Sequence, residues 1–107
     1  MVQQLHVRQF LERRGCGTPI TLIDVREHWE TVVAPVPCEH LHMPMAQIAD
    51  RLSELDPAKD TVVICHSGVR SLQVASFLEG RGFRSVYNLS GGIRAWSHEV
   101  DPTIPNY

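Results

Sequence analysis

The chain has 107 residues, of which 43% are hydrophobic and 21% charged, and its 10 basic and 12 acidic side chains give a formal net charge of −2. This length accommodates one domain with its own core, and the composition excludes a chain that is disordered throughout. The charge balance excludes a general attraction for nucleic acid or anionic membranes, and no apolar run reaches the ~18–20 residues of a membrane-spanning helix.

The predicted elements alternate between helices and strands. Apolar residues at helical spacing predict the helices, and β-rich apolar runs predict the strands. In chain order the pattern predicts helix 5–14, strand 20–25, a proline-rich loop at 34–37, short strand 40–43, helix 48–55, strand 61–65, helix 70–79, strand 85–89 and helix 91–96.

The strand at residues 61–65 is the clearest one. Its sequence, Thr-Val-Val-Ile-Cys, is apolar without alternation, which is typical of a central parallel strand covered on both faces. The predicted fold class is therefore α/β, with a small central parallel sheet and helices on both faces. Residues 1–107 form one domain, in which residues 101–107 are an extended tail. Ligands bind at the carboxyl ends of such strands, which are residues 24–27 and 65–71.

The three cysteines predict a reducing compartment. Cys16, Cys38 and Cys65 are odd in number and lack CxxC spacing, so a disulfide framework would leave one thiol unpaired. The first residues also lack the basic and then apolar pattern of a secretory signal. We therefore expect a soluble, cytoplasmic domain.

The loop after the central strand combines features that stabilise a thiolate. Its sequence is Cys65-His66-Ser67-Gly68-Val69-Arg70-Ser71. A cysteine at a helix N-terminus faces unpaired N–H groups, Gly68 permits the positive φ of an anion-binding nest, and Arg70 adds a positive charge. Two or three charged hydrogen bonds of ~1.5–3 kcal/mol each suffice to bring a thiol pKa from ~8.5 to below neutrality. A lone cysteine is more often a small buried residue, but this context favours a nucleophile.

Three ordered motifs extend across nearly the whole chain. They are the loop of residues 65–71, Leu22-Ile23-Asp24-Val25-Arg26-Glu27, and Asn88-Leu89-Ser90-Gly91-Gly92-Ile93-Arg94-Ala95-Trp96. Together they resemble one module of the rhodanese (sulfurtransferase) family, which implies a single rhodanese-like domain. Where that family carries Gly-His-Ile-Pro-Gly-Ala, this chain has Ala-Pro-Val-Pro-Cys-Glu-His, so the role of residues 34–42 stays open.

The resemblance implies an enzyme of the thiosulfate sulfurtransferase type. Cys65 would take sulfane sulfur from thiosulfate or a persulfide donor and pass it, as a Cys65 persulfide, to a thiophilic acceptor. The implied partners are a small anionic donor and a thiol, cyanide or protein acceptor, without nucleic acid, membrane, cofactor or metal. The substrate and the persulfide would be held by His66, Ser67, Gly68, Val69, Arg70 and Ser71.

Several residues keep two interpretations. Asp24 and Arg26 are supporting residues that form a structural ion pair or, in the second interpretation, guide an anionic substrate through Arg26. His66 is either a general base or part of the pocket rim. Cys38 is either a spectator or the thiol that resolves an oxidised Cys65.

Two other function classes compete with sulfur transfer. A cysteine-dependent phosphatase or arsenate reductase of related fold places five residues between cysteine and arginine. Here four residues separate Cys65 from Arg70, and a shorter loop suits a single sulfur atom better than a tetrahedral oxyanion. The third class is a non-catalytic binding module that keeps only the fold, against which the intact Cys65 argues.

Overall fold

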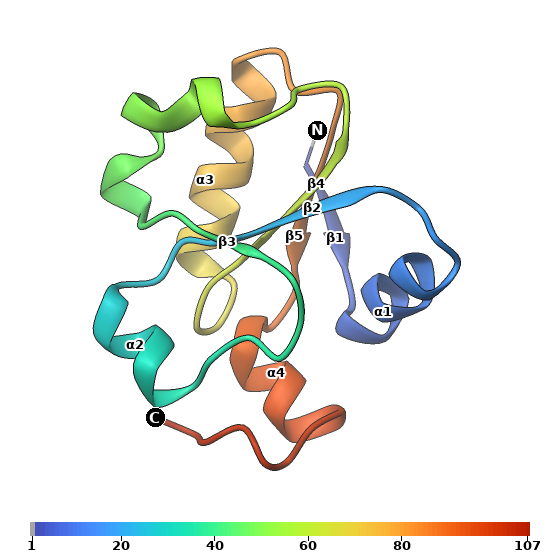
Figure 1. The fold of residues 1–107 in the computed structure, drawn as a ribbon, viewed down its shortest axis with the longest axis vertical. Helices are drawn as coiled ribbons and strands as arrows, with labels where there is room; N and C mark the ends of the chain where they lie inside the picture. The colour runs from blue at the N-terminus through green and yellow to red at the C-terminus, as the bar shows by residue number, and fades with distance from the viewer. Residues whose placement is uncertain (1) are drawn as a thin grey trace.

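Five parallel strands form the central sheet of the computed structural model, which describes residues 2–107 (Figure 1). The strands lie in the order β1-β5-β4-β2-β3, so the predicted central strand, β4, pairs with β2 on one side and β5 on the other. Their bounds are β1 (Gln3–Leu5), β2 (Ile20–Asp24), β3 (Leu41–His42), β4 (Asp60–Ile64) and β5 (Ser85–Leu89).

Helices cover both faces of the sheet, which confirms the predicted fold class. Successive residues of a strand point to opposite faces, so Val62 and Val63 belong to different halves of the core. One half packs against α1 (Val7–Gly15) and α4 (Gly92–Glu99), and the other against α3 (Val69–Gly80) (Figure 1). The Cys65 side chain belongs to the half that faces α3.

The structure contains two elements that the sequence did not predict, and it changes a third that was predicted. Strand β1 was not predicted, because its polar Gln-Gln-Leu sequence is an edge strand that buries only its leucine. Helix α2 (His28–Val33) was missed because its apolar residues are largely exposed and form no buried stripe. The helix expected at residues 48–55 is instead a pair of 3-10 segments, η1 (Met45–Gln47) and η2 (Ala49–Glu54), in which Arg51 has non-helical dihedral angles.

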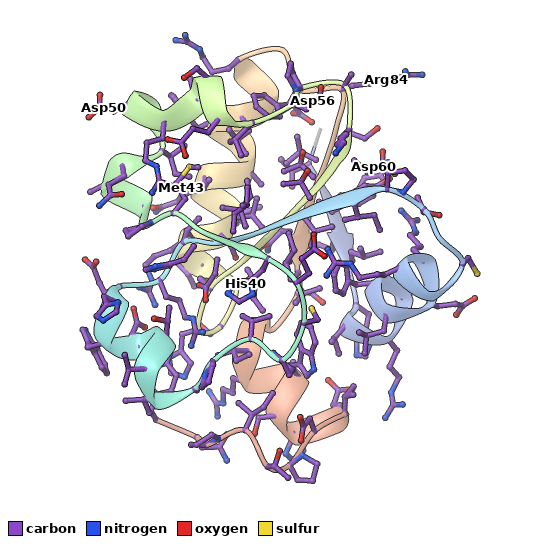
Figure 2. The ribbon with its side chains drawn as sticks, viewed as in Figure 1. His40, Met43, Asp50, Asp56, Asp60 and Arg84 are labelled. Carbon is purple, nitrogen blue, oxygen red and sulfur yellow. The ribbon has the colours of Figure 1, made fainter. Side chains whose placement is uncertain are left out.

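The two ends of the sheet differ in what they carry. Asp60 and Arg84 mark the amino ends of β4 and β5, and Figure 2 places them at the end of the molecule opposite α2 and α4. The Cys65 loop follows the carboxyl end of β4 and leads into α3. None of the helices in residues 2–107 has the length and apolarity that crossing a membrane requires.

The last seven residues lie along α4 and return to α2. Ile104 is buried in the core half that faces α1 and α4, and the Ser97 hydroxyl donates to its carbonyl at 2.6 Å. The chain then ends beside α2, as Figure 1 shows. This path brings Tyr107 to the Cys65 loop.

Candidate active site

Cys65 lies where β4 gives way to a loop that turns its backbone toward the sulfur. The side chain is 1% exposed. Gly68 caps α3 with φ of +102°, a conformation that favours glycine, and its N–H donates to Cys65 Sγ at 3.1 Å. A Cβ at this position would lie 3.3 Å from the Gly91 nitrogen, so the loop also leaves little space for a side chain there.

The surroundings of the sulfur favour its ionised form. Burial raises the pKa of the Cys65 thiol, but the hydrogen bonds around the sulfur, among them those from the amides of Ser71, Gly68 and Ser67, together lower it by more. The net direction is downward, as expected for a cysteine at the start of a helix. The Ser71 Oγ lies 3.2 Å from Sγ and is itself fully buried.

Helix α4 supports the loop from behind. The amides of Ile93 and Arg94 donate to the carbonyls of Cys65 and His66 at 2.9 and 3.0 Å. Gly92 makes this approach possible, since a Cβ there would lie only 2.4 Å from the Cys65 oxygen. The two loop carbonyls are therefore turned away from the sulfur, which leaves the loop amides free to face it.

Arg70 is held by a partner that the sequence did not indicate. Its two terminal nitrogens donate to the two carboxylate oxygens of Glu30, each at 2.7 Å. The pairing lowers the pKa of Glu30 to about 2, and it holds the pKa of Arg70 above its usual value. The Glu30 carboxylate therefore partly offsets the electrostatic effect of Arg70 on the sulfur of Cys65.

Tyr107 joins the loop to α2. Its ring stacks on His66 with centroids 4.2 Å apart and meets Trp29 edge-on at 5.7 Å. Its hydroxyl donates to Glu30 and accepts from Arg26, each at 3.0 Å. His66 therefore lies under an aromatic ring at the edge of the loop.

Asp24 and Arg26 form a closed ion pair at the end of β2. Both side chains are 0% exposed, and Arg26 donates to Asp24 through Nε and Nη2, the shortest contact being 2.8 Å. The remaining donors of Arg26 reach the Ala34 carbonyl and the Tyr107 hydroxyl. Through these contacts the guanidinium links the end of β2 to the end of α2 and to the C-terminal tail.

The other sequence-predicted residues lie around the loop in different ways. Ser67 and Val69 are exposed, and Val69 is 65% exposed. Cys38 is half-buried and accepts a hydrogen bond from Arg14 at 3.2 Å, and burial raises the pKa of its thiol. In the segment of residues 34–42, which departs from the family pattern, the imidazole of His42 contacts the Arg26 carbonyl at 2.7 Å.

A cavity of about 830 Å³ borders the outer side of the loop. Its lining includes His66 and Ser67 of the loop, Arg94 and His98 of α4, and Tyr107. The Cys65 side chain packs on the α3 side of the sheet. The cavity therefore adjoins the sulfur-bearing loop on the α4 side, where Arg94, His98 and Glu99 of α4 also line it.

Sequence reasoning missed Glu30, Asn88 and Tyr107. Asn88 is 2% exposed on β5 and accepts from the Ser71 hydroxyl at 2.5 Å. Its signal was an amide side chain between Tyr87 and Leu89 in a predicted strand. Glu30 and Tyr107 had no local signal, because their partners lie 40 and 77 residues away in the chain.

Comparison with known proteins identifies the family. The model of the rhodanese-like domain matches residues 6–99. The chain belongs to the rhodanese-like domain family. A sulfurtransferase of Allochromatium vinosum is 33% identical over 104 residues, which cover 97% of this chain and 96% of that protein. Sulfur transfer in general is thus supported for this rhodanese-like chain.

Two further similar proteins differ in how much of their length this chain matches. The rhodanese-like/PpiC domain-containing protein 12, chloroplastic, of Arabidopsis thaliana is 49% identical over 90 residues, which cover 80% of this chain and 30% of that protein. A crystal structure of a rhodanese-like domain protein from Staphylococcus aureus has a TM-score of 0.83 and 27% identity, and the alignment covers 92% of this chain and 95% of that one. The chain therefore corresponds to a whole small relative and to a part of a larger one.

Proposed function

We propose that this rhodanese-like domain transfers sulfane sulfur through a persulfide on Cys65, with thiosulfate as a competent donor. The Cys65 thiolate attacks the outer sulfur of thiosulfate, forms an S–S bond and expels sulfite with the electron pair of the broken bond. A nucleophilic acceptor such as cyanide or a thiolate then attacks the outer sulfur of the persulfide. The second step yields thiocyanate or an acceptor persulfide and restores the thiolate.

The observation that carries this proposal is the convergence of donors on one buried sulfur. The Gly68 amide lies 3.1 Å from Sγ, and the amides of Ser67 and Ser71 also act on it. Donors fixed in place before the reaction stabilise an anion without the cost of reorganising solvent. They serve the thiolate first and then the negative outer sulfur of the persulfide.

The size of the loop favours the transfer of a sulfur atom over the binding of a phosphate group. Four residues separate Cys65 from Arg70, and the guanidinium of Arg70 is engaged by both oxygens of Glu30. A tetrahedral oxyanion needs several free donors around it at once. In this loop the amides of Ser67, Gly68 and Ser71 instead converge on one sulfur atom.

The test is the mass of the protein after treatment with thiosulfate. Wild type is expected to gain about 32 Da, the mass of one sulfur atom. Cyanide should then remove this mass and release thiocyanate in equal amount. Cys65→Ser should gain nothing, whereas the matched variants Cys16→Ser and Cys38→Ser should load sulfur like wild type.

Two results would count against the proposal. Sulfur that loads equally onto Cys65→Ser would place the reaction at another thiol. Steady release of phosphate from p-nitrophenyl phosphate that depends on Cys65, without any gain of sulfur mass, would support the phosphatase alternative.

A further inference from the structure

Asn88 lies behind the sulfur in a chain of hydrogen bonds whose directions are fixed. Its side-chain nitrogen Nδ2 donates to the Gly68 carbonyl at 3.1 Å and to Gln4 Oε1 at 3.0 Å. A backbone carbonyl only accepts, so the NH₂ of Asn88 must face Gly68. The amide oxygen Oδ1 therefore faces Ser71.

The orientation of Asn88 decides where the Ser71 proton points. An amide oxygen also only accepts, so the hydroxyl of Ser71 donates its single proton to Asn88 Oδ1 across 2.5 Å. The side of Ser71 Oγ that faces Cys65, 3.2 Å away, then carries a lone pair. A thiol can donate to that lone pair, whereas a thiolate cannot.

We propose that Asn88 is a positioning residue for sulfur transfer, which turns the Ser71 proton away from Cys65 and thereby withholds one donor from the thiolate. Turning the proton back to sulfur would leave Oδ1 of a residue that is 2% exposed without a donor, and unsatisfied buried acceptors are costly. The amides of the loop therefore carry the stabilisation of the thiolate.

The consequence for catalysis rests on the proposed function. A thiolate that keeps a higher pKa is a stronger nucleophile, with a Brønsted coefficient of about 0.4–0.5. Once the persulfide has formed, Sγ is neutral and no longer needs the Ser71 proton. Asn88 thus raises the free energy of the thiolate relative to both the resting thiol and the persulfide. The same effect makes the thiolate a stronger nucleophile.

The charged and titratable groups around Cys65 are shared by all variants in the test. They are His66 and Arg70 on the loop, Glu30 on α2, Tyr107 in the tail, and the Asp24–Arg26 pair at the end of β2. None of them contacts Asn88 or the Ser71 hydroxyl among the described hydrogen bonds. A change on substituting Asn88 or Ser71 therefore reports on the hydroxyl proton.

The experiment is a double-mutant cycle of Asn88→Leu and Ser71→Ala. The rate of alkylation of the Cys65 peptide by iodoacetamide, resolved by mass spectrometry, is followed across a pH range that spans the ~8.5 of a free thiol. Asn88→Leu frees the Ser71 proton for sulfur, so the inflection should fall by about one unit. Ser71→Ala should raise the inflection in the Asn88→Leu background and lower it in wild type, where the hydroxyl supports the thiol.

That reversal of sign is the decisive result. If Ser71→Ala raises the inflection equally in both backgrounds, the hydroxyl donates to the thiolate in wild type and the proposal is wrong. The wild-type background decides this even if Asn88→Leu fails to fold. Gln4→Leu is the matched control: it removes the exposed partner of Asn88 but keeps the Gly68 contact, so its inflection should equal that of wild type.

A second measurement follows sulfur loading itself. In single turnovers with thiosulfate, above both inflections, persulfide formation by Asn88→Leu should be about threefold slower than by wild type for each unit of lowered pKa. An unchanged or faster rate would overturn the catalytic part of the proposal. If thiosulfate loads no variant, the proposed function fails, while the alkylation result still decides the direction of the Ser71 proton.

Discussion

The carboxyl ends of β4 and β2 are neighbours in the sheet, yet they carry opposite kinds of polar structure. At the end of β2, Asp24 and Arg26 meet as full opposite charges, each 0% exposed. At the end of β4, neutral amides converge on the sulfur of Cys65, which becomes negatively charged only when the thiol loses its proton. The first arrangement is balanced internally, whereas the amides of the second gain a charged partner only when the sulfur is ionised.

The contrast separates a structural ion pair from the proposed reactive site at equivalent positions of one fold. Burial does not distinguish them, because Cys65 is as deeply buried as the ion pair. The distinction lies in whether the donors already have their partner. The guanidinium of Arg26 donates to Asp24, to the Ala34 carbonyl and to the Tyr107 hydroxyl. The loop amides instead face a sulfur atom whose charge depends on its protonation.

The largest effect is expected from Cys65→Ser. A serine hydroxyl is not ionised at neutral pH, so sulfur transfer from thiosulfate to cyanide should fall to background. The thermal unfolding midpoint should stay close to that of wild type, because the two side chains are similar in size. A thiocyanate assay and a melting curve check both parts, and retained turnover would remove Cys65 from the nucleophile's role.

The β2 side of the contrast is tested by Asp24→Asn. This substitution leaves the Arg26 charge buried without its counter-ion, and breaking a buried pair costs about 3–5 kcal/mol. Denaturant unfolding should show a loss of stability of this size, while the folded fraction keeps its turnover. A variant of unchanged stability but lower turnover would instead make the ion pair part of the reaction site.

The sequence predicted the β4 side of this contrast better than it predicted the residues that surround the Cys65 loop. The continuous apolar strand, its parallel pairing and the loop from Cys65 to Ser71 follow from local composition, and Gly68 has the positive φ that the loop required. These features depend on residues that are adjacent in the chain. They are therefore visible without knowledge of the tertiary fold.

The partners of the loop depend on contacts that only folding creates. Glu30 is on a helix whose exposed Trp29 and Val32 break the usual amphipathic pattern, so neither α2 nor its ion pair with Arg70 was predicted. The ion-pair interpretation of Asp24 and Arg26 agrees with the contacts that both residues make. The difference is that Asp24 and Arg26 are two residues apart, whereas Glu30 and Arg70 are 40 apart.

The Glu30–Arg70 pair should make stability depend on acidity. The folded pKa of Glu30, about 2, lies below its ordinary value of 4.5, so the pair stabilises the fold above pH 4.5 and loses this contribution as the pH falls toward 2. The shift corresponds to at most about 3 kcal/mol, which solvent screening reduces because the Arg70 side chain is 33% exposed. Glu30→Gln should unfold with a smaller dependence on pH in this window than wild type.

Capture of the donor should respond in opposite directions to the two partners of that pair. Arg70→Ala removes the positive charge near the sulfur, so the KM for thiosulfate should rise by about three- to tenfold while kcat changes less. Glu30→Gln unmasks the same charge, so KM should fall by a few-fold. Initial-rate kinetics at two ionic strengths check this prediction, and equal effects of both variants would show that Arg70 acts only through the fold.

The smallest expected effect is that of Arg70 on the thiol. Arg70→Ala should raise the inflection of Cys65 alkylation by about half a unit, because Glu30 already balances most of the guanidinium charge and part of the side chain is in solvent. The loop amides remain in the variant, so the inflection should stay below the ~8.5 of a free thiol. In a Glu30→Gln background the same substitution should raise the inflection further, since the charge is no longer shared. A wild-type inflection near 8.5 would mean that amides without a counter-charge do not hold a thiolate here, and the contrast between the β4 and β2 ends would then lose its chemical meaning.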